Sequence, residues 1–476
     1  MDDTDRSTTH EQAPSRRGSA QAPVVADADV VVIGGGPGGF AAALRARREG
    51  CSVVLVERFD MPGGVHTSGL QGAANPGVGG IHTELMARFE RAGCIYVADE
   101  RSLPDWAGNP LSHYDYHLAP GSAFRRMSFN PDGAGNQMAM MLQEAGVHAI
   151  YGAAFVDVVT APDGDERRIT HAVVETVAGR QAISGRVFVE GTGTAEVVAR
   201  AGAPYVRGGG RQPGTLGDGV ARPIPGGLLW IMSGIDFAET AAYQKRENDP
   251  SLLKLIERAR AAGDIPDDLY RPRLAAQGVY GDHYIGHPTV DMSPIQAPGT
   301  FIFWQNVPYE WALHMDDDAE HASRARREMR RLVDAEAGFL RQYVPGFQHA
   351  FISHVGRQLG VRDGRHPIGE YVFSIDDARE ERRFPDAVTR PMTKTFFWDA
   401  YRRYTFEVPY RCFLPKAVSN LLLTGASLSF TFETIFMVMR NFPWCTQTGE
   451  IAGLAAARCI REGTGPKQLR WTEPLF

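Results

Sequence analysis

The 476-residue chain is long enough for two or three domains, and its 43% hydrophobic residues suffice for ordinary cores. The formal net charge is -6 and no basic patch is interleaved with aromatic residues, which argues against nucleic acid as a partner. The longest apolar region, 430–439, is too short to span a bilayer, so we expect no membrane partner. Five cysteines without a C-x-x-C pair argue for a cytoplasmic protein and against a metal site.

The first 26 residues are polar and show no periodic apolar face, so we expect a disordered tail over 1–27. Arg16 and Arg17 resemble a twin-arginine export signal. Such a signal needs an apolar stretch before the mature fold, and here the next apolar run is the first strand. We therefore expect no export signal.

The first structured stretch is a strand followed by a helix. Residues 30–33 form a β-branched run typical of a buried parallel strand, and residues 41–48 are good helix formers. Gly34, Gly36 and Gly39 give G-x-G-x-x-G at the turn between them. The first glycine makes the tight turn, the second lets the backbone approach a pyrophosphate, and the third lets helix and strand pack closely. The phosphates would then bind the free N–H groups at the helix start.

The next strand is expected over 51–56, with Glu57 at its end, where an acid can accept hydrogen bonds from a ribose. Strand, glycine turn, helix, strand and acid in this order predict a dinucleotide site. The stretch 61–72 is too rich in glycine for a regular element. Such a loop can wrap a flat ligand closely.

Further elements of this first part are expected in chain order. They are helices at 81–93 and 136–144, strands at 147–151 and 154–159, and a hairpin of 168–177 with 181–189. Residues 188–196 form a strand that ends in small residues before a helix at 197–201. Small side chains leave space at the carboxyl edge of a sheet, where ligands bind, although an ordinary strand-to-helix turn fits equally well.

The composition shifts to Gly, Pro and Arg over 208–227, which indicates a crossing to a second domain. There we expect strands at 228–234 and 301–307 and helices at 250–262 and 316–343. The arginines of the last of these helices are interpreted as a solvated face rather than a partner site.

The chain then returns to the first domain. Residues 419–426 are expected to form a buried strand, and the last helix is expected at 448–461. Because that helix would open with Gly449, its N-terminal amides are expected to approach a ligand closely.

These blocks resemble FAD-dependent oxidoreductases with a glutathione-reductase-like flavin domain, akin to the fumarate reductase and succinate dehydrogenase flavoprotein branch. The resemblance covers nearly everything after residue 28 and rests on 31–40, Glu57, 63–69, 190–193, 345–347, 360–365, 369–371, 408–416, 420–422 and 445–453. In the block 190–193 the family usually has Asp-Ala-Thr-Gly. Two departures put some polar flavin contacts in doubt: Thr194-Ala195-Glu196 stands at the family's acid-rich turn, and Ala426 stands where an arginine often follows the late glycine.

The resemblance implies an α/β fold. It would consist of a Rossmann-like FAD-binding domain, discontinuous and completed by the C-terminal segment, with an inserted α+β substrate domain. The expected boundaries are 1–27 for the tail, 28–220 and 406–476 for the FAD-binding domain, and 221–405 for the substrate domain.

The resemblance also implies FAD as cofactor. Gly34, Gly36 and Gly39 would hold the pyrophosphate, Glu57 the adenosine ribose, and the Val156 backbone the adenine. The full set of expected cofactor-binding residues is Gly34, Gly36, Pro37, Gly38, Gly39, Glu57, Arg58, Gly63, Gly64, His66, Thr67, Ser68, Val156, Thr192, Gly193, Gly425, Thr448, Gly449, Ile451 and Ala452.

His66 is the residue singled out for chemistry. The stretch 65–72 is similar to the Ser-His-Thr-x-x-x-Gln-Gly segment in which fumarate reductase and succinate dehydrogenase flavoproteins carry a histidine bonded to the flavin 8α carbon. Such a link makes the flavin a stronger oxidant. The alternative is a histidine that contacts the flavin or forms a hydrogen bond within the loop.

No second strand-glycine-helix pattern follows residue 150, so the sequence lacks the second dinucleotide domain of pyridine-nucleotide disulfide reductases. The Trp-x-Trp-x-Ile-Pro motif of flavin halogenases is absent as well. These absences favour oxidation of a small organic substrate by hydride transfer to flavin N5, with oxygen or another compound as electron acceptor. The apolar stretch 430–440 suggests an apolar or aromatic substrate, or else a helix that packs in the core.

The acid/base or substrate-anchoring candidates are Arg362, Arg365, Tyr401, Arg411, Glu433 and Arg440. Each also fits a structural role, because long polar side chains satisfy strand ends and helix carbonyls. Two other function classes stay open: an isomerase or cyclase that uses flavin without net oxidation, and a non-catalytic FAD-binding protein. The sequence does not indicate the oligomeric state.

Overall fold

The computed structural model describes residues 22–74, 79–97, 127–207, 226–249, 252–270, 292–296, 299–306, 315–362, 364–390, 392–396, 402–431, 434 and 440–475. Two predicted site residues, Tyr401 and Glu433, lie outside these ranges. So do most of the expected crossing at 208–227 and nearly all of the apolar stretch 432–439.

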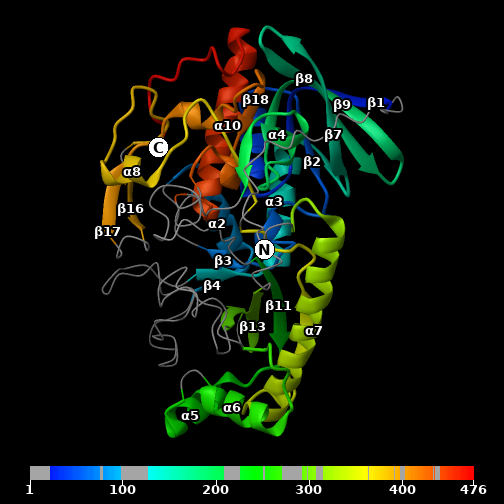
Figure 1. The fold of residues 1–476 in the computed structure, drawn as a ribbon, viewed down its shortest axis with the longest axis vertical. Coiled ribbons are helices and arrows are strands. Elements are labelled where there is room, and N and C mark those ends of the chain that lie inside the picture. The colour runs from blue at the N-terminus through cyan, green and yellow to red at the C-terminus, as the bar shows by residue number, and fades with distance from the viewer. Residues whose placement is uncertain are drawn as a thin grey trace, which may run out of the picture.

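A seven-stranded sheet organises the first domain (Figure 1). Its order is β6-β2-β1-β9-β8-β7, with β18 also paired to β9. The strands are β1 (Val24–Ile33), β2 (Val53–Glu57), β6 (His148–Tyr151), β7 (Ala154–Asp163), β8 (Glu166–Thr176), β9 (Gly179–Glu190) and β18 (Leu421–Leu423). Strands β6, β2, β1, β9 and β18 run parallel, whereas β8 is antiparallel to both β7 and β9. The pairing of β18 with β9 completes the discontinuous Rossmann-like domain, and the predicted fold class is confirmed.

Strand β1 begins earlier than the predicted tail allows. Val24 pairs with Ala182 and Asp27 with Ser184 of β9, so the end of the expected disordered segment 1–27 belongs to the sheet. The prediction was wrong there because Val24 and Val25, although apolar, are exposed and belong to no periodic apolar face. Its pairing is supplied by β9, which lies more than 150 residues later in the chain.

Helices α1 (Pro37–Arg48) and α10 (Phe442–Glu462) pack directly against each other. A Cβ atom added at Gly449 would lie 2.0 Å from the Gly38 oxygen, and one at Gly453 would lie 2.4 Å from the Ala42 oxygen. These two glycines therefore let two helix backbones touch, which corrects the expectation that Gly449 opens a helix towards a ligand. The helix starts six residues earlier than predicted, with Pro443 in its first turn.

The remaining helices and strands of the first domain are short except for two helices. They are α2 (Gly80–Arg91), α3 (Pro131–Ala145), α4 (Glu196–Arg200), α8 (Ile375–Arg379), β3 (Ala73–Ala74), β4 (Ile95–Val97), β5 (Met127–Phe129), β10 (Tyr205–Arg207), β15 (Arg365–Pro367), β16 (Met392–Phe396) and β17 (Arg402–Phe406). Strands β3, β5 and β4 form a small sheet, and β10-β15 and β16-β17 form two antiparallel pairs.

The inserted domain is built on a four-stranded antiparallel sheet of order β12-β13-β11-β14. Its strands are β11 (Gly227–Ser233), β12 (Met292–Gln296), β13 (Thr300–Asn306) and β14 (Phe351–Val355). Its helices are α5 (Phe237–Glu247), α6 (Leu253–Ala262) and α7 (Ala319–Tyr343). In Figure 1 this domain lies below the large sheet, and α7 runs along one side from the first domain down to α6.

The hydrophobic cores divide the chain differently from the predicted boundary at 405. The core of the inserted domain runs from Leu228 to Leu359. Phe373, Val388 and Phe406 instead pack in the core of the first domain. We therefore propose that the inserted domain ends close to residue 362 and that the rest of the chain completes the first domain.

No helix in the described part of the chain is long and apolar enough to cross a membrane. Within the same residues, no group of three or more His, Cys, Asp or Glu side chains is arranged to hold a metal ion.

Candidate active site

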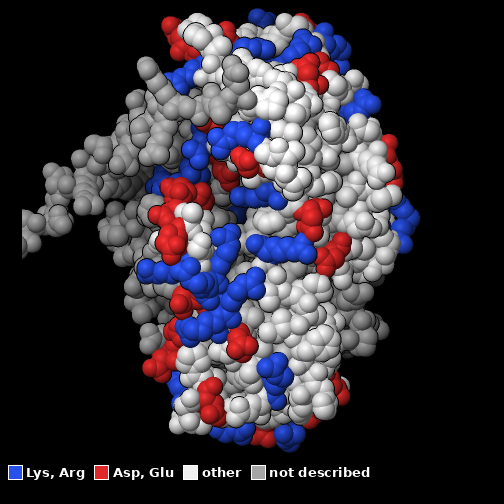
Figure 2. Space-filling model, turned by 90° about the vertical axis from the view of Figure 1, so that its right-hand side faces the viewer, with Lys and Arg blue, Asp and Glu red and all other residues white. Residues whose placement is uncertain are grey.

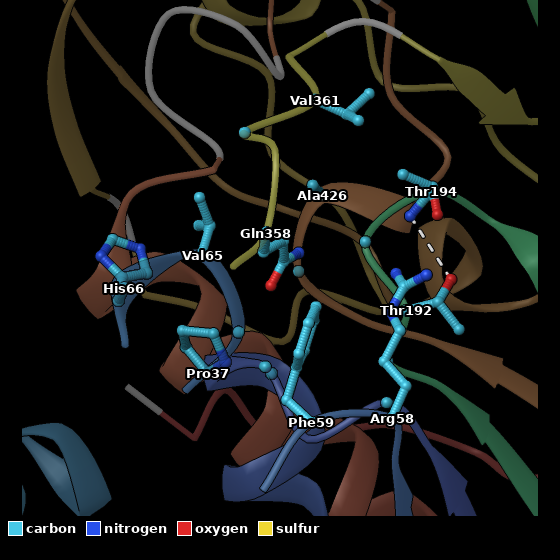
Figure 3. Close-up of a pocket in the computed structure, with 18 of the residues that line it drawn as sticks. Pro37, Arg58, Phe59, Val65, His66, Thr192, Thr194, Gln358, Val361 and Ala426 are labelled. Atoms are coloured by element: carbon cyan, nitrogen blue, oxygen red, sulfur yellow. Dashed lines mark hydrogen bonds between the residues drawn. The ribbon is translucent and has the colours of Figure 1, made fainter. Parts of the chain in front are cut away.

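A cavity of about 520 Å³ lies where β1, β2 and β9 end against the start of α1 and the inserted domain. In Figure 3, Arg58 and Thr192 lie on one side of it and His66 on the other, with Pro37 and Phe59 between them. The cavity is therefore elongated, and it sits at the carboxyl edge of the parallel strands, where open α/β sheets bind their ligands.

The three glycines of the first turn have different structural roles. Gly34 has φ +93°, and a Cβ there would lie 2.5 Å from the Gly191 oxygen. A Cβ at Gly39 would lie only 1.8 Å from the Gly34 oxygen, whereas at Gly36 the nearest atom is 3.6 Å away. The fold itself thus requires glycine at 34 and 39, but nothing in the protein requires it at 36, which lines the cavity.

Glu57 lies at the end of β2 and is 4% exposed. Its carboxylate accepts hydrogen bonds from the Gly35 amide (2.7 Å) and the Phe59 amide (2.8 Å). Burial raises the pKa of Glu57, and these two amide donors oppose that rise. The side chain is held in place against the cavity by its own backbone neighbours.

Glu190, where the family usually has aspartate, lies at the end of β9 and is fully buried. It accepts hydrogen bonds from the amides of Thr192 (2.7 Å) and Val197 (2.8 Å), so it fixes the turn that leads into α4. Burial raises the pKa of Glu190 to about 7. Its role is structural, because it holds Thr192 and Gly193 at the wall of the cavity.

The glycine-rich loop after Glu57 is tied to both domains. The Gly63 amide donates to the Gly35 oxygen (2.7 Å), which fastens the loop to the turn before α1. The Ser68 oxygen accepts from the amides of Arg357 (2.9 Å) and Gln358 (3.2 Å) of the inserted domain. The loop is therefore held in one conformation between the domains.

His66 is 5% exposed and lies on the lining of the cavity. Its Nδ1 is 3.1 Å from the Gln71 oxygen. Because a carbonyl oxygen only accepts, we assign the proton to Nδ1, which leaves the lone pair on Nε2. The ring stacks on Phe442 at 4.7 Å. Burial lowers the pKa of His66 to about 4, with His82 and Arg440 adding repulsion, so the ring is neutral at neutral pH.

This lowered pKa predicts a pH dependence of stability. Between pH 6.5 and about 4 the unfolded chain binds a proton at His66 that the folded chain does not. The contribution of His66 to the free energy of unfolding is therefore complete above pH 6.5 and is lost as the pH falls towards 4. Between pH 7 and 5 the loss in unfolding free energy should be about 2 kcal/mol. Urea unfolding of the FAD-free wild type and His66→Asn at both pH values measures it.

The comparison with His66→Asn is needed because Glu190 changes the free energy of unfolding with pH in the opposite direction. Its raised pKa means that the folded chain keeps a proton between pH 4.5 and about 7, so its contribution to stability falls as the pH rises. The difference between the wild type and His66→Asn isolates the histidine. Equal pH dependences for the two proteins would contradict the prediction.

The structure brings many of the predicted site residues to the cavity. The predicted residues that line it are Gly34, Gly36, Pro37, Gly38, Glu57, Arg58, Gly64, His66, Thr192, Gly193, Arg362, Gly425 and Arg440. Those that do not are Gly39, Gly63, Thr67, Ser68, Val156, Arg365, Arg411, Thr448, Gly449, Ile451 and Ala452. In place of Val156, the lining includes the three residues before it, 153–155.

Several of the residues behind the lining are structural. The Thr67 hydroxyl donates to the Pro62 oxygen (2.7 Å), and Thr448 Oγ1 accepts from the Gly425 amide (2.9 Å). Ile451 and Ala452 are fully buried in the core. For Thr448, Ile451 and Ala452 the reason is the early start of α10, which places them in its second and third turns rather than at its first amides.

Arg411 and Arg365 differ from their predicted roles. Arg411 pairs with Asp386, with Nε 3.0 Å from Oδ2, and lies over the ring of Tyr371 outside the cavity. Arg365 donates to the Thr194 oxygen (3.0 Å) and to Asp316 Oδ2 (3.0 Å). Both arginines therefore hold the protein together, and neither reaches into the cavity.

The sequence prediction missed several lining residues. Phe59 projects into the middle of the cavity, and Gln358 lies beside it (Figure 3). Gln358 Oε1 is buried and has no hydrogen-bond partner among the described residues. Asn441 and Phe442 line the cavity at the start of α10, and Pro443 was the sequence signal for that start.

A Rossmann-like sheet with a glycine turn, a buried acid and an elongated cavity at the ends of β1, β2 and β9 defines a dinucleotide-binding enzyme with an inserted domain. The chain belongs to the FAD dependent oxidoreductase family, which it matches over residues 29–474. The resemblance drawn from the sequence is thereby confirmed, and the protein is an FAD-dependent oxidoreductase.

Other comparisons are more distant. The chain is 32% identical to the dihydrolipoyl dehydrogenase of Chlorobaculum parvum over 159 residues. This aligned stretch covers 32% of this chain and 30% of that protein. The chain thus spans less than a third of that relative. A flavoprotein/dehydrogenase from Cytophaga hutchinsonii is 13% identical at TM-score 0.45, covering 92% of this chain and 79% of that one. The p-nitrophenol 4-monooxygenase of Pseudomonas putida is 13% identical at TM-score 0.44, covering 93% and 82%.

Proposed function

We propose that FAD lies along this cavity and that the enzyme oxidises a small apolar or aromatic substrate by hydride transfer to flavin N5. The observation that carries the proposal is the elongated cavity that runs from Glu57 and Arg58, past the start of α1, to His66. The residues at its first end suit the adenosine ribose, and those at its second end suit the isoalloxazine.

Three features of the chain fit a bound dinucleotide. The start of α1 has no side-chain cap, so its N–H groups are available to phosphates. Gly36 leaves space at the same place, although the protein itself does not need a glycine there. Gln358 Oε1, which has no partner in the described protein, can accept a hydrogen bond from a ligand hydroxyl or N–H in the middle of the cavity.

Bound FAD would supply the two-electron acceptor for the reaction. The positive end of the 21-residue helix α10 opens on the cavity at Asn441 and would stabilise negative charge near it. Leu229, Met315 and Leu359 of the inserted domain line the cavity and would exclude water and bind an apolar substrate. Arg362 and Arg440 supply positive charges to anchor or protonate the substrate.

We also propose that His66 Nε2 bonds to the flavin 8α carbon. The ring is neutral, its Nδ1 is engaged with Gln71, and Phe442 fixes its plane, so Nε2 is the available nucleophile. In such a bond Nε2 would supply the electron pair and Nδ1 would keep its proton towards Gln71. The 8α methyl group would lose one proton, the two electrons of its C–H bond would reduce the flavin, and oxygen or another external oxidant would take up those two electrons.

Anaerobic mixing of the FAD-loaded enzyme with a panel of alcohols, amines and saturated carbonyl compounds tests the proposed activity. Under anaerobic conditions a substrate should bleach the visible flavin band for as long as no acceptor is present, and readmission of oxygen or another acceptor should restore the band. Turnover only after prior reduction of the flavin would instead indicate an isomerase or cyclase. If the purified chain bound no FAD, the whole proposal would fall.

We propose a cytoplasmic location and a small-molecule substrate, with no nucleic acid or membrane partner. The support for the location is that all five cysteines are free and buried, as in proteins of a reducing compartment.

A further inference from the structure

Helix α7 carries a run of arginines whose partners differ. Arg327 pairs with Glu320 (2.9 Å), and Arg331 pairs with Glu328 (2.9 Å) and with Asp268. Arg326 and Arg330 have no acidic partner in the part of the chain that the structure describes. Arg326 and Arg330 are both exposed, as expected for a solvated face, but they lack the ion pairs of Arg327 and Arg331.

Arg326 and Arg330 are four residues apart on α7, so their side chains are neighbours, and like charges at this spacing destabilise a helix. Arg58, which follows β2 in the first domain, also repels the positive charge of Arg326. Desolvation and then repulsion from Arg58 and Arg330 lower the pKa of Arg326. Figure 2 shows Lys and Arg side chains gathered on the face of the molecule that carries α7.

The cluster opens on the cavity, because Arg58 and Arg326 both belong to its lining. Among the described residues, the acid that pairs with Arg58 is Glu196, at 3.4 Å, and both of these side chains are partly exposed. Two positive charges, Arg58 and Arg326, thus lie at the lining with Glu196, and Arg330 adds a third charge beside Arg326 outside the lining. Two neighbouring guanidinium groups at the lining, one from each domain, suit the oxygen atoms of a phosphate.

We propose that Arg58, Arg326 and Arg330 form a phosphate-binding site across the two domains, and that its ligand is a phosphate group of a nucleotide. The inference rests on the proposed function, since one source of this phosphate is FAD itself. The other source is a second nucleotide, such as a reductant or product that binds after FAD. In either case a helix of the inserted domain takes part in nucleotide binding.

The test compares Arg326→Gln with Arg327→Gln, which removes an equal charge from the same helix at a position paired with Glu320 and outside the cavity lining. In the first arm, FAD is titrated at low and physiological ionic strength into FAD-free proteins that also carry His66→Asn, so that binding is reversible. In the second arm, NADP⁺ and ADP are titrated into the FAD-loaded proteins. Thermal melting of each variant shows that it is folded.

Arg326→Gln should weaken binding about tenfold in one arm, with the effect smaller at higher salt, while Arg327→Gln should change it little. Loss in the first arm identifies the phosphates of FAD, and loss in the second arm identifies a second nucleotide. Equal behaviour of the two variants in both arms, with FAD bound normally, would overturn this inference and leave the proposed function standing. Failure of the wild type to bind FAD would overturn both.

Discussion

Gly36→Ala should fold normally but lose FAD. The new Cβ would lie 3.6 Å from the nearest atom, the Gly191 oxygen, which is an ordinary contact, and the Gly36 backbone is already in a conformation open to any residue. The methyl group would occupy the place where the backbone approaches the pyrophosphate. We expect FAD affinity to fall about a hundredfold, which is about 2.7 kcal/mol. Titration of the FAD-free protein in a His66→Asn background, which prevents the proposed covalent bond, measures it by flavin fluorescence.

Gly39→Ala is the matched control for this experiment. Its Cβ would lie 1.8 Å from the Gly34 oxygen, so α1 would have to move away from β1. This variant should lose about 3 kcal/mol or more of stability, visible as a lower melting temperature even without FAD. Unchanged FAD affinity in a folded Gly36→Ala protein would contradict the proposed cofactor site.

The contrast between these two glycines shows what the sequence could establish. Strand, glycine turn and acid are local in the chain, so their spacing alone predicted the Rossmann-like unit and the positions of Gly34, Gly36 and Glu57. The start of α10 was missed because Gly449 was interpreted as the opening of a helix towards a ligand, whereas Gly449 and Gly453 let two helices touch. The packing role of these glycines depends on the tertiary contact between α1 and α10, which a single sequence does not reveal.

The same limit explains the arginines. Arg365 reaches Asp316 and Arg411 reaches Asp386, and in each case the acid is 25 or more residues away along the chain. Spacing in the sequence does not distinguish such an arginine from one that faces a cavity. Gln358 was missed for a similar reason, because its importance lies in an unsatisfied oxygen that only the folded structure reveals.

The inserted domain does more than cover the cavity. Leu70, at the end of the glycine-rich loop, packs with Leu229, Ile231 and Ile302 in a separate small core. The Ser68 oxygen accepts hydrogen bonds from the amides of Arg357 and Gln358 in the inserted domain. The loop that bears His66 is therefore fixed by both domains, which gives the histidine a defined position relative to α1 and α10.

This rigidity is why His66→Asn should have a large and simple effect. If Nε2 bonds to the flavin, acid precipitation of the wild type should leave a yellow, fluorescent pellet, because a carbon–nitrogen bond survives unfolding. The variant should bind FAD without a bond, and its pellet should be colourless with all flavin in the supernatant. The unbonded flavin should also be a weaker oxidant.

His82→Asn is the control. Like His66, His82 contacts the Phe442 ring, with ring centroids 5.2 Å apart, but His82 is not part of the cavity lining. This variant should keep the acid-stable flavin, since it leaves Nε2 of His66 in place. A colourless pellet from the wild type would remove the covalent bond from the proposal and leave His66 as a neutral ring held against the flavin by Gln71 and Phe442.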